Sequence, residues 1–254
     1  MTLLCWTRAI AYAQRPYSHV SWTPVSPIAT LVRTYATKKA CANCGTPNAT
    51  ASLQCNKCDT LQPLPPSVDY YDVLGIPWES VPHQGWQVDQ SALKAQWRRT
   101  MALSHPDRLV HKPDNEQEIG AHQSAILNKA YETLRQPLPR VLYSVRIDDL
   151  PQLERQGIEG IPEGTSMADP SLLMEVMELQ EALADAEDEA AVEQVNEANQ
   201  EHMQDVLTQL DEAFAHTPLD TQRVQALAMQ LRYWTNIAKA IREWQPGKRP
   251  ELQH

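Results

Sequence analysis

Residues 89–135 read DQSALKAQWRRTMALSHPDRLVHKPDNEQEIGAHQSAILNKAYETLR, with a helical pattern on either side of a His-Pro-Asp triplet at 105–107. The first pattern spans 89–104 and ends there because a residue that precedes proline avoids the α region. The second spans 116–135. We therefore predict an antiparallel helix pair whose connecting loop exposes a histidine and a carboxylate. The apolar residues recur at intervals near 3.6 and are Leu93, Trp97, Met101 and Leu103 in the first helix and Ile119, Ile126, Leu127, Ala130, Tyr131 and Leu134 in the second.

The first helix of this pair also carries a basic face. Lys94, Arg98 and Arg99 cluster on the side opposite the apolar residues, directly before the triplet. A shorter helical start at 69–76 precedes the pair and stops at Gly75. The triplet alone is a weak indicator of function, because His105 also fits an ordinary helix C-cap. Its meaning depends on the rest of the chain.

Four cysteines upstream have the spacing of a metal site. Cys41 and Cys44 form one C-x-x-C pair, and Cys55 and Cys58 form a second pair ten residues later. Two such pairs can fold back and present four thiolates to one tetrahedral zinc ion. The protein would fill all four positions, so we predict a structural rather than a catalytic Zn²⁺. A pair of disulfides and a redox-active C-x-x-C are the alternatives.

The N-terminal 58 residues contain six basic residues and no acid, although the whole chain of 254 residues has a net charge of −10. Residues 1–35 carry spaced arginines and many Ser and Thr residues, a composition typical of a mitochondrial transit peptide. The alternative is a disordered basic tail. The remaining chain, with 16 basic and 32 acidic residues, would repel a phosphate backbone, so nucleic-acid binding is disfavoured. No apolar run approaches the length of a membrane span.

The C-terminal third predicts two long helices that form a small antiparallel bundle. Residues 170–214 hold 13 acids and no Lys or Arg, and a second helix is expected over 221–244. Core stripes are expected at Leu172, Val176, Leu179, Leu183 and Ala186, and at Val224, Leu227, Ala228, Leu231 and Ala238.

Three apolar side chains fall outside the first of these stripes. Leu173, Met174 and Met177 lie beside Glu178 and Glu181, which is more apolar surface than one helix needs for its own bundle. One interpretation is a wider core. The other is a partner-binding patch with an apolar centre and an acidic rim.

Taken together, these motifs resemble the HscB-type J-proteins, co-chaperones of iron–sulfur cluster assembly. The matching segments are Tyr70–Gly75 (YYDVLG), the triplet at 105–107, Asn128–Leu134 (NKAYETL), and Leu138, Arg140 and Tyr143. The LMEVMELQE segment at 173–181 and Leu231-Arg232-Tyr233 match as well, so the resemblance covers about 185 residues. Animal-type mitochondrial members also carry a four-cysteine module.

The resemblance implies two protein partners and no catalytic residue of the chain's own. His105, Pro106, Asp107, Arg108, Lys94, Arg98 and Arg99 would dock on a mitochondrial Hsp70 and stimulate its ATPase. Arg108 departs from the family's usual lysine, which keeps the charge and changes the hydrogen-bond geometry. Leu173, Met174, Met177, Glu178, Glu181 and Tyr233 would bind the cluster scaffold protein in the mitochondrial matrix.

The expected fold is all-α and L-shaped, a J-domain hairpin and a C-terminal bundle preceded by a zinc knuckle. The expected boundaries are a transit peptide at 1–35, the tetracysteine module and linker at 36–66, the J-domain at 67–147, a connector at 148–168, the scaffold-binding helices at 169–246 and a tail at 247–254. Three alternatives stay open: a general J-protein with another client, a zinc- or thiol-dependent oxidoreductase, and a purely structural helical protein.

Overall fold

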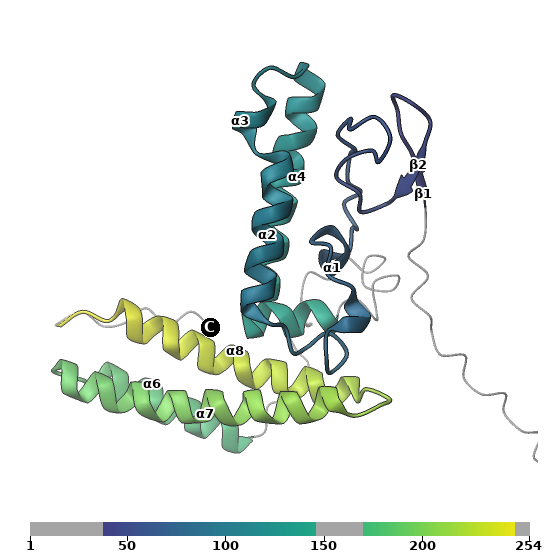
Figure 1. Ribbon diagram of the computed structural model, residues 1–254. Coiled ribbons are helices and arrows are strands. Elements are labelled where there is room, and N and C mark those ends of the chain that lie inside the picture. The colour runs from purple at the N-terminus through teal and green to yellow at the C-terminus, as the bar shows by residue number, and fades with distance from the viewer. Residues whose placement is uncertain (1–37, 146–169, 247–254) are drawn as a thin grey trace, which may run out of the picture. The chain divides into compact units, whose positions relative to one another are not determined.

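The computed structural model describes residues 38–145 and 170–246 (Figure 1). The expected transit peptide, connector and tail lie outside the described residues. What is described is mostly helical, as predicted, with one small β-hairpin at its start. The hairpin pairs β1 (Lys38–Ala40) with β2 (Pro47–Ala49) in antiparallel register, and a single bridge between Gln54 and Leu61 continues the irregular segment that follows.

The predicted helix pair is present and close to its predicted bounds. Helix α2 spans Gln90–Ser104 and helix α4 spans Asp114–Arg135, and the two lie side by side (Figure 1). The carboxylate of Asp89 accepts hydrogen bonds from the first-turn amides of Ser91 and Ala92, which satisfies main-chain donors that the helix itself leaves free. The short α1 (Tyr70–Val73) has the same kind of cap in Asp69, and a 3₁₀ turn at Trp78–Ser80 leads toward α2.

The triplet differs from the exposed loop that we predicted. A short helix that we did not predict, α3 (Pro106–Leu109), begins at the proline itself. His105 does leave the helical region, with φ −65° and ψ 132°, as a residue before proline should. Proline is, however, well suited to the first position of a new helix because its missing N–H needs no partner there. The triplet is therefore a corner between two helices.

A further helical segment at 137–145 follows α4 and fastens α1. The hydroxyl of Tyr143 accepts a hydrogen bond from the amide of Tyr70 at 2.9 Å and donates to the carboxylate of Asp69 at 3.0 Å. The rings of Tyr70 and Tyr143 stack with centroids 4.4 Å apart. One side chain thus holds both the cap and the first residue of α1.

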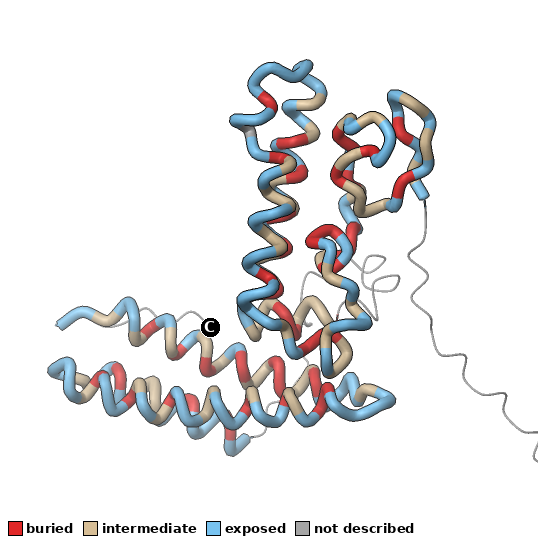
Figure 2. Tube along the Cα trace, viewed as in Figure 1, coloured by how far each residue is buried: buried red, intermediate tan, exposed pale blue. Residues whose placement is uncertain are grey.

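The C-terminal bundle contains three helices where we predicted two. They are α6 (Pro170–Ala184), α7 (Glu189–Ala215) and α8 (Thr221–Glu243). The acidic stretch that we took as one helix is interrupted at 185–188, and Asp188 caps the start of α7 by accepting from the amide of Ala191. Buried residues recur along the sides of the helices that face each other (Figure 2).

Two principal apolar cores hold the described chain. The first lies among α1, α2 and α4, around the fully buried Leu93 and Leu127. The second lies within the C-terminal bundle, around Leu210 and Trp234, and it also receives Trp86. The indole N–H of Trp86 donates to Asp211 at 2.5 Å, and its ring stacks on Phe214 at 5.0 Å. Within the described ranges, no helix is both long and apolar enough to cross a lipid bilayer.

We predict that Leu127→Ala destabilises the helix pair by about 2–5 kcal/mol, because it removes a fully buried side chain and leaves a cavity. The measurement is urea unfolding followed through amide hydrogen exchange of α2 and α4. Val110→Ala is the control, since Val110 is 61% exposed and its truncation should change stability by less than about 0.5 kcal/mol. Equal effects of the two variants would contradict this description of the core.

Candidate functional sites

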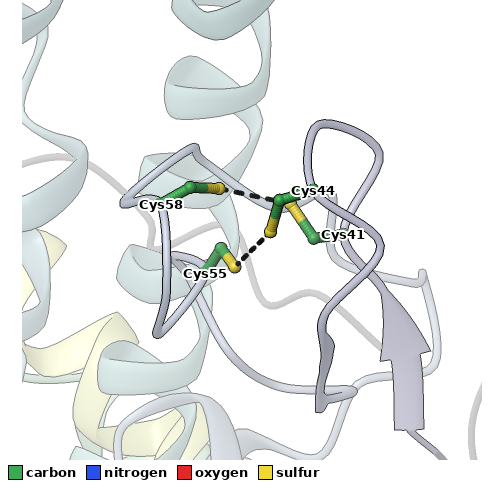
Figure 3. A group of neighbouring side chains, drawn as sticks. All are labelled: Cys41, Cys44, Cys55 and Cys58. Atoms are coloured by element: carbon green, nitrogen blue, oxygen red, sulfur yellow. Dashed lines mark hydrogen bonds between the residues drawn. The ribbon is translucent and has the colours of Figure 1, made fainter.

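The four cysteines converge as predicted (Figure 3). All four sulfur atoms lie within 4.8 Å of one another. The Cys41 and Cys58 sulfurs are 3.6 Å apart, and so are those of Cys44 and Cys55. These separations far exceed an S–S bond of about 2.05 Å, and all four cysteines are free. They are close to the roughly 3.8 Å edge of a tetrahedron whose metal–sulfur bonds are about 2.3 Å long, so the sulfurs are positioned to bind one metal ion.

The two C-x-x-C pairs repeat one local geometry. The amide of Cys41 donates to the carbonyl of Thr46 at 2.9 Å, and the amide of Cys55 donates to that of Thr60 at the same distance. Gly45 occupies the left-handed region at φ 71°, and Asp59 takes the equivalent place at φ 55°. Aspartate tolerates this region better than most side chains do, which explains how the second turn forms without a glycine.

Amide donors surround the sulfurs. The carboxamide of Asn48 donates to the Cys55 sulfur at 3.5 Å, and that of Gln62 donates to the Cys41 sulfur at 3.4 Å. Such contacts offset negative charge on a cluster of thiolates and orient the ligands. Hydrogen bonds from the hydroxyl and the main-chain amide of Thr60 lower the pKa of Cys58 to about 6. The main-chain amide of Lys57 is the leading cause that lowers the pKa of Cys55. Both shifts favour the thiolate, the form that binds metal.

The triplet forms a second site at the corner between α2 and α3. The Nδ1 atom of His105 accepts a hydrogen bond from the amide of Asp107 at 3.3 Å, so the imidazole caps α3 while its residue ends α2. The Asp107 carboxylate lies 3.6 Å from the same nitrogen and is 87% exposed. The side chain of Arg108 reaches back and donates to the carbonyl of Ala102 at 2.8 Å. These bonds fix the corner and leave a carboxylate facing solvent.

The basic face of α2 is present and exposed. Lys94, Arg98 and Arg99 all have exposed side chains, and Arg99 also donates to Gln96 at 2.9 Å. Each precedes the triplet by 6 to 11 residues on the helix that ends at it. The structure therefore presents positive charge on α2 and a carboxylate at the end of that helix.

The surplus apolar residues of α6 are on its surface. Leu173, Met174 and Met177 are 39%, 64% and 57% exposed, whereas Leu172 and Val176 are buried. Glu178 and Glu181 are exposed as well. We call these five exposed residues the α6 patch. A partner-binding patch requires these side chains to be exposed, as they are. A wider core would have buried them.

Tyr233 does not share the exposure of the α6 patch. It lies on α8, is only partly exposed, and packs against the core of the C-terminal bundle. The predicted core stripe of its helix does not include it. Its neighbour Trp234 is buried and stacks on His202, with ring centroids 4.3 Å apart, so the buried side of α8 is broader than the predicted stripe.

Comparison with known proteins places the chain in a family. Residues 168–242 match the family model of the HSCB C-terminal oligomerisation domain. The mitochondrial J-type co-chaperone Jac1 of Saccharomyces cerevisiae is 34% identical over 172 residues, which are 66% of this chain and 85% of that protein. The chain belongs to the HscB/Jac1 family of iron–sulfur cluster co-chaperones.

Other members agree in sequence and in structure. The mouse iron–sulfur cluster co-chaperone protein HscB is 32% identical over 206 residues, covering 80% of this chain and 81% of the mouse protein. The crystal structure of human co-chaperone protein HscB is similar with a TM-score of 0.66 and 29% identity, covering 81% of this chain and 98% of that structure. The predicted fold class and family resemblance are confirmed.

Sequence reasoning missed the polar residues that support this HscB-type chain's tetracysteine module, residues 38–62. Asn48, Gln62 and Gln123 are buried, and none was singled out. For Gln123 a signal existed, because it lies four residues before Leu127 on the buried face of α4. A polar residue at a core position of a helix indicates a specific hydrogen-bonding partner.

We predict that Thr60→Val raises the pKa of Cys58 from about 6 toward its ordinary value, because the thiolate loses a hydroxyl donor. In metal-free protein, alkylation of Cys58 by iodoacetamide at pH 7 should slow several-fold, measured by mass spectrometry across a pH series. Thr46→Val is the matched control, because Thr46 makes the equivalent 3.3 Å contact with Cys44 and none that is recorded with Cys58. A Cys58 profile that is unchanged in Thr60→Val would contradict this origin of the shift.

Proposed function

We propose that this HscB/Jac1-family protein is a mitochondrial matrix co-chaperone that recruits an Hsp70 through the triplet and a cluster scaffold protein through the α6 patch. The observation that supports it most is the corner at His105 and Asp107, which follows directly on the exposed basic face of α2. The mitochondrial relative named above supports the location. In this role the chain activates the ATPase of its partner and makes or breaks no bond itself.

The Hsp70 contact is proposed to work by electrostatic steering followed by a fixed hydrogen-bonding corner. Lys94, Arg98 and Arg99 attract an acidic chaperone surface and raise the rate of encounter. The main-chain amide of Asp107 is held by the cap at His105, so the exposed carboxylate extends from a fixed backbone when it forms a charge-assisted hydrogen bond. Arg108 ties α3 to the end of α2 through its hydrogen bond to the carbonyl of Ala102, and Pro106 occupies the first turn of α3, where proline is favoured.

The scaffold contact is proposed to bury the apolar part of the α6 patch. Methionine suits such a surface because its long flexible side chain adapts to the partner. The rim of Glu178 and Glu181 favours a basic counterpart and disfavours acidic ones. Tyr233 would contact the scaffold protein from the side of the bundle, over the smaller area that its partial burial leaves exposed.

Zn²⁺ is the metal that we propose for the four cysteines, because a tetrathiolate set with tetrahedral spacing is typical of structural zinc. The ion would supply folding energy to the tetracysteine module and take no part in chemistry. A metal analysis that finds one tightly bound zinc per chain, with no redox cycling of the thiols in a thiol titration, would support this role over the alternative of a thiol oxidoreductase.

Two binding surfaces on one chain would bring the scaffold and the Hsp70 together. Each partner then meets the other at a raised effective concentration, set by the chain that joins them. Release of the cluster would follow from the ATPase cycle of the Hsp70. A general J-protein with a different client remains distinguishable, because it would use the triplet and not the α6 patch.

We predict that His105→Gln abolishes stimulation of the mitochondrial Hsp70 ATPase, because glutamine cannot reproduce the imidazole cap at the start of α3. Single-turnover ATP hydrolysis measures the stimulation. Scaffold binding, measured by isothermal titration calorimetry, should stay unchanged and serves as the control for folding. Stimulation equal to that of the unmodified protein would refute the proposed Hsp70 mechanism.

We predict that the triple variant Leu173→Ala/Met174→Ala/Met177→Ala weakens scaffold binding by at least about a hundredfold, given ~1 kcal/mol or more for each truncated anchor. Stability should change little because these side chains are exposed. Thr208→Ala, at an exposed position on α7, is the control. Unchanged scaffold affinity with an intact fold would leave the general J-protein as the better description.

A further inference from the structure

A buried carboxamide on α4 joins the tetracysteine module to the end of α2. The side chain of Gln123 is fully buried, and its Nε2 atom donates to the main-chain carbonyls of Leu53 and Gln62, each at 2.7 Å. Its Oε1 atom accepts from the hydroxyl of Ser104 at 2.5 Å. Ser104 is the last residue of α2 and is followed directly by His105.

The same contacts reach the metal ligands at the other end. Gln62, whose carbonyl accepts from Gln123, donates through its own side chain to the Cys41 sulfur at 3.4 Å. The carbonyl of Leu53 also accepts from the amide of Gln62 at 2.8 Å, beside the bridge that closes the second cysteine turn. The positions of both carbonyls therefore depend on the turn that carries Cys55 and Cys58.

Apolar contacts follow the same route. Leu61 from the module and Leu109 from α3 are both buried and both lie against Gly120 of α4. A Cβ atom at Gly120 would overlap Leu109 and touch Leu61, so the absence of a side chain lets all three approach closely. The hydroxyl of Ser124 adds a bond to the carbonyl of Ser104 at 2.9 Å. The module and α3 thus share one stretch of α4.

We propose that the tetracysteine module is a metal-dependent brace for the His-Pro-Asp corner, with Gln123 as the positioning residue between them. When the four sulfurs are held together, the Leu53 and Gln62 carbonyls fix the carboxamide of Gln123, which fixes Ser104 and the start of α3. When the module loosens, Gln123 loses two acceptors in a buried place, and the corner loses an anchor. Because such coupling is reciprocal, ordering of the corner also favours metal retention.

The test uses amide hydrogen exchange of the full chain, loaded with one equivalent of Zn²⁺ and then stripped with a chelator. In the unmodified protein, stripping should raise exchange of the amides at 104–110 about tenfold, the effect of one lost buried hydrogen-bonding arrangement. In Gln123→Met, which keeps the volume and removes the polar atoms, exchange should already be fast and respond little to zinc. Corner amides that ignore zinc in the unmodified protein, or respond fully in Gln123→Met, would overturn the brace.

Two further variants separate coupling from general weakening. Ser104→Ala breaks the link at its corner end, so it should speed corner exchange, remove the response of that exchange to zinc, and weaken zinc retention by no more than the same factor. Lys39→Met breaks bonds to the carbonyls of Ser52 and Pro63, at 2.8 Å each, which lie outside α4. It should speed zinc release and keep the response of the corner to zinc. If corner exchange in Ser104→Ala still responds fully to zinc, or corner exchange in Lys39→Met no longer responds to zinc, the brace is overturned. Ser104→Ala keeps this test valid should Gln123→Met fail to fold.

The consequence for Hsp70 rests on the proposed function, whereas the exchange measurements need no Hsp70. In the unmodified sequence, removal of zinc should raise the co-chaperone concentration needed for half-maximal ATPase stimulation severalfold. In Gln123→Met this concentration should not depend on zinc. If His105→Gln stimulates normally while corner exchange follows zinc, the Hsp70 mechanism fails and the brace stands. If stimulation depends on His105 while corner exchange ignores zinc, the brace fails alone.

Discussion

The tetracysteine module has too little apolar interior to hold its own shape, and this constraint governs the first half of the molecule. Of its buried side chains, Leu53 belongs to the core around α1, α2 and α4, and Leu61 packs toward Gly120 of α4. What remains inside is chiefly sulfur, with amide donors directed at it. We expect a segment built this way to depend on bound metal for its folding, and it relies on a neighbouring helix for its remaining contacts. That helix is α4, which also supports the His-Pro-Asp corner.

The sequence was most informative where one periodicity controls one element. The intervals of apolar residues located α2 and α4 to within two residues. The helix α3 was missed because Pro106 ends one helix and begins another, and the first effect alone was considered. No helix was predicted at 137–145, although a proline near the start of a segment fits the first turn of a helix.

The break between α6 and α7 shows a different limit. Residues 185–188 are two aspartates, an alanine and a glutamate, none of which forbids a helix, so local preference could not reveal the interruption. Asp188 was available as a capping residue, but aspartates are frequent in this stretch. On either side of the break, Leu183 of α6 and Val192 and Val195 of α7 pack into one apolar cluster with α8. The α6 patch, by contrast, followed from the wheel because its residues lie clearly off the buried stripe.

Polar residues inside the fold were the hardest to foresee. Gln123 has the spacing of a core residue and the polarity of a surface residue. Its burial is explained only by the two carbonyls, distant in sequence, that accept its hydrogen bonds. Cysteine ligands are recognised by their spacing alone, whereas a carboxamide that joins two modules has no sequence motif. The fold and the ligand set were therefore predictable, and the connection between them was not.

The uneven charge of the C-terminal bundle has a consequence for its behaviour in solution. Eight carboxylates on and just before α7 are exposed, from Glu187 to Glu212, and α6 and α7 contain no lysine or arginine. Mutual repulsion along this face works against the compact bundle, so dissolved counter-ions should strengthen it, the reverse of what a fold held by ion pairs would show. Moderate ionic strength is then part of the native environment that this bundle requires.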